Sequence, residues 1–379
     1  MTSQLIQTRD QTQLWAETWD RPQGDVLPVQ REIALAVAES LALELLPEDS
    51  LAQIRSTTAV TSAYEEYLRG REMWNRFESD ALEQARGHFE RALELDPSFL
   101  HARSGLAEAL NMLAIYRGPK AEMFEAGIRQ AEAVLALDPD HAEAHNALGY
   151  AQLYHLWDFE AAESSFRRAI EIAPNFAMAY HYMTGVLSAM GRHDEAIDAC
   201  LRAESLDPLS LSVRSDLGWY YLFADRFEDA ALECEETLAA DPNYGWAVSC
   251  LVEAHLATGR WEAAWDALRK RMTIDGQRPE ELLVEEGEAP APETLIRRYY
   301  EAQLARQLEA LRTGQRWPMD LAMSHARLDR RAEALDFLEE AAADKNLMAV
   351  FMAVHPAFRN LRQEERFVAL LQRSGLREP

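Results

Sequence analysis

The residues best suited to chemistry are the two histidines of "HAEAH", His141 and His145, and three cysteines, Cys200, Cys234 and Cys250. Histidines four residues apart could share a metal ion on one helical face, but zinc sites need three or four ligands and no third ligand is evident. His141 is expected in a turn between helices and His145 in a packing position. We therefore predict no metal site and no cofactor.

The cysteines indicate packing and not catalysis. Cys200 and Cys234 are 34 residues apart, at equivalent positions of a repeat described below, where small buried residues are expected. Three cysteines in 379 residues do not make a disulfide framework and suit a reducing compartment. The chain has no phosphate-binding glycine loop, GxSxG elbow or CxxC pair, so no catalytic residue is predicted.

The composition excludes several classes of partner. With 64 acidic and 38 basic residues the formal charge is -26, which argues against binding nucleic acid through the phosphate backbone. No run approaches 18 apolar residues, and the N-terminus lacks a basic-then-apolar signal pattern. We expect a cytoplasmic protein that contacts neither a membrane nor nucleic acid directly.

The stretch "LALDPDHAEAHNALGY" is predicted to end one helix at Asp-Pro and to begin another, and the same sequence pattern recurs along the chain. The prolines concerned are separated by 42, 35, 34 and 34 residues; they are Pro97, Pro139, Pro174, Pro208 and Pro242. A fixed period in this range is typical of stacked helical repeats. In the unit 177–208, apolar residues line one face of a first helix, Gly191 is the expected left-handed cap, and a second helix ends at Pro208.

These units resemble the tetratricopeptide repeat, whose small residues occupy fixed close-packing positions. The matching residues are Leu148-Gly149 and Leu217-Gly218 on first helices, Ala162, Ala196, Ala230, Ala264, Ala92, Ala169 and Ala203 on second helices, and the large Phe89 and Phe166. The resemblance implies an all-α solenoid, a right-handed superhelix of about six helix pairs over residues 57–276. An acidic, loosely packed linker is expected at 277–293 and a helical, repeat-like cap at 294–379.

Tetratricopeptide proteins bind peptides on a concave face formed by the first helices of the repeats. Counted from the prolines, the resemblance assigns to this groove Asn146, Tyr150, Leu153, Tyr154, Met178, His181, Ser215, Trp219, Leu222, Phe223, Trp246, Ser249 and Glu253. The set lacks the Lys and Arg residues that grip a C-terminal carboxylate. Exposed aromatic residues are common interface anchors, although single ones could instead fill gaps between helices. We therefore expect an extended or helical peptide ligand, and replacing Trp219 or Tyr154 with Ala should weaken its binding without unfolding the array.

The first fifty residues do not fit the repeat. "LWAETWDR" (14–21) and "VQREIALAVA" (29–38) resemble the closing hairpin and last helix of a TolB-like α/β domain, and the C-terminal "VFMAVHPAFRNLRQEERFVALLQRSGL" resembles the usual ending of that family. Its members are bacterial regulators that carry a winged-helix DNA-binding module or a nucleotide cyclase before the repeats. We expect residues 1–46 to dock on the first repeats or to pair with a second copy, and we favour the homodimer.

The leading interpretation is a non-enzymatic protein-interaction scaffold, the peptide-binding arm of a bacterial signalling or transcription-regulatory system. A carbohydrate-active helical enzyme is an alternative, but it needs two carboxylates 5 to 9.5 Å apart, and Glu143 and Glu253 lie three repeats apart. A third alternative is self-association, with the groove filled by the chain's own N-terminal helix or by a second copy.

Overall fold

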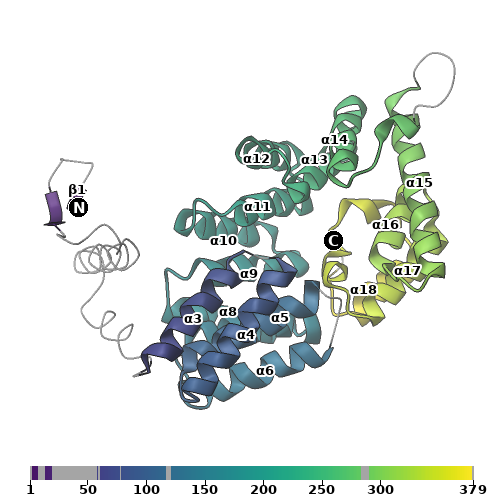
Figure 1. Ribbon diagram of the computed structural model, residues 1–379. Helices are drawn as coiled ribbons and strands as arrows, with labels where there is room; N and C mark the ends of the chain where they lie inside the picture. The colour runs from purple at the N-terminus through teal and green to yellow at the C-terminus, as the bar shows by residue number, and fades with distance from the viewer. Residues whose placement is uncertain are drawn as a thin grey trace.

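Paired antiparallel helices stack from residue 61 to residue 274 (Figure 1). The computed structural model describes residues 2–6, 13–18, 58, 60–76, 78–116, 121–282 and 290–377. Within that part the pairs are α3 (Thr61–Trp74) with α4 (Ser79–Leu95), α5 (Leu100–Tyr116) with α6 (Ala121–Leu135), α7 (Ala142–Ala151) with α8 (Phe159–Ile172), α9 (Ala177–Ala189) with α10 (His193–Leu206), α11 (Leu211–Phe223) with α12 (Phe227–Ala240), and α13 (Gly245–Ala257) with α14 (Trp261–Ile274). The first helices of successive pairs contact one another and form the inner face of the stack.

Small residues allow the helices to approach closely, as the repeat template predicts. All seven of the predicted alanines on second helices are completely buried. A Cβ at Gly149 would lie 2.9 Å from the ring of Phe166, and one at Gly218 would lie 2.7 Å from Cys234 Sγ. The large second-helix residue therefore needs a glycine opposite it, and at Gly218 the smaller Cys234 occupies the same place.

Helix ends follow local sequence. Gly191 has φ +70°, so the predicted left-handed cap after α9 is confirmed. Asp158 caps α8 by accepting a hydrogen bond from the backbone N–H of Ala161. No pattern in the sequence predicted that α7 continues as a π-helical turn, Gln152–Leu156, which ends at Trp157 with φ +60°.

The C-terminal helices turn back toward the stack. After the short η2 (Pro279–Leu282), a single long helix, α15 (Pro292–Arg312), leads to the pair α16 (Pro318–Arg327) and α17 (Arg331–Ala343). Two 3-10 turns, η3 (Leu347–Phe351) and η4 (Pro356–Leu361), and α18 (Glu365–Arg373) complete this part. Figure 1 shows these yellow elements curving back beside the teal helices, and η3 contacts α9 while η4 contacts α13.

The N-terminal region contributes two described strands, β1 (Thr2–Ile6) and β2 (Gln13–Thr18), which pair antiparallel with Thr2 opposite Thr18. The predicted helix over residues 25–46 lies outside the described residues, and so do residues 283–289 of the predicted linker. The α/β-remnant origin of residues 1–50 and the homodimer stay predictions. Among the described helices, none combines the length and apolarity that crossing a bilayer requires.

Candidate binding groove

The structure places the predicted groove residues on the inner face, but it buries most of them. Asn146, Tyr150, Leu153, His181, Ser215, Trp219, Leu222 and Phe223 are buried, and Tyr154, Met178, Ser249 and Glu253 are half-buried. Trp246 alone in this predicted set is exposed, at 37%. The expectation of an exposed aromatic row is therefore wrong for the buried members, and the reason lies in their packing.

An aromatic and polar cluster joins α9, α11 and α13. The rings of Trp219 and Trp246 stack with centroids 4.5 Å apart, and Trp219 Nε1 donates to the Trp246 carbonyl at 3.3 Å. Asp216 links the helices, because Oδ1 accepts from Trp246 Nε1 at 2.6 Å and Oδ2 contacts His181 Nε2 at 2.8 Å. The structure thus brings Trp219, Trp246 and His181 together, as a packed cluster between neighbouring repeats.

Residues 347–361, here called the return segment, cover the aromatic part of the inner face. The ring of Phe351 stacks on Phe223 with centroids 5.2 Å apart. The His355 ring lies 5.7 Å from Trp219 and 6.0 Å from Phe223, and His355 is fully enclosed at 2% exposure. The groove is therefore filled by the chain's own C-terminal part, and not by the N-terminal helix or the second copy that the third alternative predicted.

Polar contacts on either side of the aromatic rings also join the C-terminal part to the repeat stack. Arg359 forms an ion pair with Asp225, and its guanidinium lies 4.5 Å from the centre of the Phe227 ring. Lys345 Nζ donates to the Leu156 carbonyl at 3.0 Å. Glu253, one of the predicted groove residues, pairs with Arg327 of α16.

The burial corrects one mutational expectation. Trp219 is only 4% exposed and packs on both Trp246 and His355, so its replacement with Ala should destabilise the fold and not only a complex. Tyr154 is half-buried and packs on Tyr150 with ring centroids 4.7 Å apart. The role of these residues in peptide binding stays a prediction.

The first turns of the inner helices keep partial exposure. The residue four positions after each repeat proline is half-buried or exposed in every case, and these residues are His101, Glu143, Met178, Ser212 and Trp246. We call them the rim row. Only Met178 and Trp246 of this row were predicted, although the same proline offset, applied to Pro97, Pro139 and Pro208, would have named the others.

Charged and amide side chains fill the inner face at α3, α5 and α7. Arg71 Nη1 donates to Glu108 Oε2 at 2.6 Å, and Asn146 Nδ2 donates to Glu108 Oε1 at 3.4 Å. Burial raises the pKa of Glu108, and the Arg71 guanidinium opposes that rise. Asn111 Nδ2 donates to the Ala147 carbonyl at 2.8 Å. The buried amides are thus paired with Glu108 and with the backbone of α7.

Cavities in this region are small. One of ≈ 10 Å³ is lined by Glu108, Asn111, Met112, Asn146, Ala147, Tyr150 and Tyr182, which is room for about one water and not for a peptide side chain. A shallower hollow of ≈ 380 Å³ lies along α8 and is lined by its mutually paired charges, including Arg167 with Glu163 and Arg168 with Glu171. Among the described residues, neither hollow offers a ligand site.

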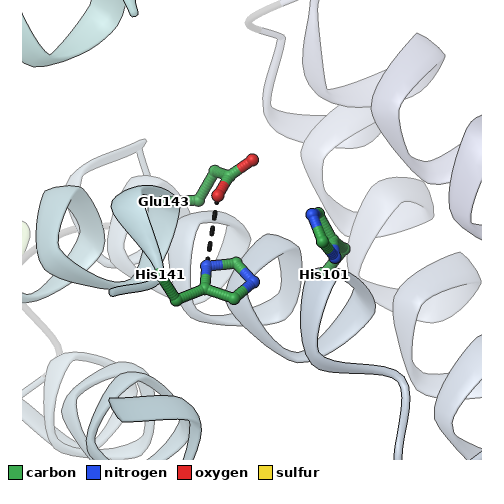
Figure 2. Close-up of side chains that lie close together, drawn as sticks. All are labelled: His101, His141 and Glu143. Carbon is green, nitrogen blue, oxygen red and sulfur yellow. Dashed lines mark ion pairs between the residues drawn. The ribbon is translucent and has the colours of Figure 1, made fainter. Parts of the chain in front are cut away.

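His101, His141 and Glu143 converge at the start of α5 and α7 (Figure 2). Their ligand atoms all lie within 4.8 Å of one another, and His141 Nδ1 lies 3.1 Å from Glu143 Oε2. His145, the partner considered in the sequence analysis, is directed elsewhere, with Nε2 2.9 Å from the Pro139 carbonyl. The third member, His101, was missed because it comes from the preceding repeat, 40 residues before His141.

Residues 120–175 and 186–245 match the family model described as tetratricopeptide repeat. Over these two ranges the helix pairs are tetratricopeptide repeats. The match falls on the helix pairs whose spacing and close-packed alanines predicted that repeat.

Two curated proteins are similar over part of the chain. A small glutamine-rich tetratricopeptide repeat-containing protein 2 of Mycosarcoma maydis is 29% identical over 86 residues, which are 23% of this chain and 24% of that protein. A protein of Rhizobium meliloti (strain 1021), provisionally named adenylate cyclase 3, is 27% identical over 153 residues, which are 40% of this chain and 26% of that protein. The chain thus spans about a quarter of the length of each of these relatives.

Solved structures resemble the chain at low identity. A thermophilic TPR protein of Thermus thermophilus is 19% identical with a TM-score of 0.42, covering 52% of this chain and 98% of that one. The pilF protein of Pseudomonas aeruginosa is 19% identical with a TM-score of 0.41, covering 64% of this chain and 99% of that one.

Proposed function

We propose that this protein is a non-enzymatic protein-interaction scaffold that binds a polypeptide segment of its partner along the inner face of the repeat stack. The observation that carries the proposal is the return segment, because the inner face already holds a polypeptide by stacking Phe351 on Phe223 and packing the tilted His355 ring against Trp219. Such a surface suits peptides that present aromatic residues with a basic residue nearby, as Phe351 and Arg359 do.

The rim row is the part of the inner face that a partner can reach while the return segment is in place. Trp246 supplies a partly exposed aromatic ring, and Met178 supplies a flexible apolar side chain. At about 25 cal/mol per Å² of apolar area, covering the remaining surface of one Trp contributes on the order of 1 kcal/mol, so several rim contacts are needed together.

We further propose that the scaffold serves a bacterial signalling or transcription-regulatory system. The resemblance of residues 1–50 to the end of a TolB-like domain supports this context, and so does the similarity to a protein provisionally named adenylate cyclase 3. In this role the repeats would dock a partner, while the output activity would reside in another domain or protein.

Site-specific photo-crosslinking tests the location of binding. A photoreactive residue at Trp246 or Met178 of the full chain should crosslink a partner that the same residue at Leu232 does not. Leu232 is the matched control, because it is 54% exposed and lies on the second helix α12. Equal crosslinking from Leu232, or crosslinking from Leu232 alone, would contradict an inner-face site.

A further inference from the structure

The His101, His141 and Glu143 cluster remains unexplained by peptide binding (Figure 2). Two side chains come from the equivalent first-turn position of consecutive inner helices, His101 of α5 and Glu143 of α7, and the third is the residue that precedes α7. Because these helices pack against each other, three possible ligands from two repeats meet at one point.

His141 is the residue of this cluster whose ring nitrogens lack a hydrogen-bond partner among the described residues. Its side chain is 2% exposed, and neither ring nitrogen makes a hydrogen bond to a described residue. Nδ1 lies 3.1 Å from Glu143 Oε2, but outside hydrogen-bond alignment. Buried polar groups are nearly always satisfied by protein, water or an ion, so this imidazole indicates a missing ligand.

We propose that His101, His141 and Glu143 bind one divalent transition-metal ion, for which Zn²⁺ is the best fit. Two imidazoles and one carboxylate form a standard three-ligand zinc set, with the fourth position left to water. Their donor atoms lie within 4.8 Å of one another, so small side-chain rotations bring them to the separations of a tetrahedral site. The ion would tie the second repeat to the third.

The charges around the cluster favour a cation. Glu143 supplies a carboxylate, which is an ordinary ligand for a divalent cation beside two imidazoles. Arg71 of α3 is the opposing positive charge, and it is compensated by Glu108 at 2.6 Å.

Zinc titration of the full chain tests the proposal. The protein should carry no polyhistidine tag and should first be stripped with a chelator. Calorimetry should then show one Zn²⁺ per chain. Glu143→Gln and His101→Gln should each weaken binding by more than about 100-fold, beyond the 10- to 100-fold loss typical of an outer-shell partner. His145→Gln is the control and should stay within about twofold of the wild type, because His145 faces the Pro139 carbonyl.

Cobalt spectroscopy separates this site from the cysteines and from misfolding. Co²⁺ should give the visible bands of a tetrahedral N/O site without a thiolate charge-transfer band, since Cys200, Cys234 and Cys250 are buried and belong to the repeat core. The spectrum should disappear in Glu143→Gln while the helical circular dichroism is retained. The proposal is wrong if the wild type binds no more tightly than the Glu143→Gln/His101→Gln double variant, or if a thiolate band accompanies binding.

Discussion

The two halves of the inner face are built on different chemistry. At α3, α5 and α7 it holds an ion pair, amides and the histidine–glutamate cluster, with Arg71 and Glu108 at the centre. At α9, α11 and α13 it holds aromatic residues, and the return segment covers them with Phe351 and His355. Both halves are built on the inner helices of the same repeat. The repeat therefore determines the direction of a side chain, but not whether that side chain packs as an apolar ring or forms a polar contact.

The difference shows how each half satisfies its buried groups. Apolar surface needs cover from water, and here the chain supplies that cover from residues more than 100 positions later in the sequence. Buried charge instead needs an opposite charge or an ion, and the polar half supplies it within two or three neighbouring repeats. The aromatic half therefore depends on distant packing, and the polar half on local pairing.

Phe351→Ala should have the largest effect, because it removes the ring that stacks on Phe223. Truncating a buried Phe costs about 3–5 kcal/mol of unfolding free energy. The loss should concentrate on the aromatic half, so hydrogen exchange should rise in residues 347–361 and in α9 and α11. Urea unfolding gives the size of the loss and hydrogen exchange its location.

Leu232→Ala is the matched control for Phe351→Ala. Leu232 is 54% exposed on the outer helix α12, so its truncation should cost no more than about 0.5 kcal/mol. A Phe351→Ala loss as small as this control would mean that the return segment does not stabilise the aromatic half, and the comparison between the halves would fail.

Arg71→Ala should have the next largest effect, because it leaves Glu108 buried without its positive partner. Removing one member of a buried ion pair costs about 3 kcal/mol at pH 7. Burial already raises the pKa of Glu108 in the folded chain. A carboxyl group with a raised pKa contributes stability to the folded chain that is lost as the pH rises through that pKa. The deficit of the variant should therefore shrink from pH 7 to pH 5 as Glu108 is protonated, and urea unfolding at the two pH values measures it.

The double variant Arg71→Met/Glu108→Leu separates pairing from packing. Apolar residues of similar size often replace a buried ion pair with little change, so the double variant should lie within about 1 kcal/mol of the wild type. If it is as unstable as Arg71→Ala, the polar half depends on side-chain shape and not on charge pairing.

The sequence predicted the repeat well because the repeat is local. Proline-terminated helices, Gly191 and the alanines at fixed positions all follow from spacing within about 35 residues, and the structure has them as predicted. The same template placed the groove residues on the inner face, since side-chain direction follows from helix periodicity.

The exposure of the groove could not be predicted in the same way. Whether Trp219 is free or covered depends on where residues 347–361 lie, and that depends on the long α15, which does not follow the repeat. His101 was missed for a simpler reason, since a search for ligands within one helix overlooks the neighbouring repeat. The outer limits of the domains and the role of residues 1–46 stay predictions.

The smallest effect concerns pH and the aromatic half. Burial and, to a lesser extent, the nearby Arg327 lower the pKa of His355 from an ordinary value of 6.5 to about 3, so the folded chain keeps this imidazole neutral. Its Nδ1 accepts a hydrogen bond from the Ala357 N–H at 3.2 Å, which also requires the neutral form. Because the unfolded chain takes up a proton below about pH 6.5, His355 contributes stability that is present above that pH and is lost as the pH falls toward 3. Between pH 7 and 5 the loss is about 2 kcal/mol, at 1.36 kcal/mol per pH unit below 6.5.

The variant His355→Asn tests this, because Asn retains a cap for the Ala357 N–H but cannot titrate. Its unfolding free energy should be lower than that of the wild type at pH 7. On going to pH 5, its unfolding free energy should decrease by about 2 kcal/mol less than that of the wild type does. Urea unfolding of both proteins at the two pH values measures this, and equal slopes would show that the imidazole titrates alike in the folded and unfolded chains, contrary to its enclosure against Trp219 and Phe223.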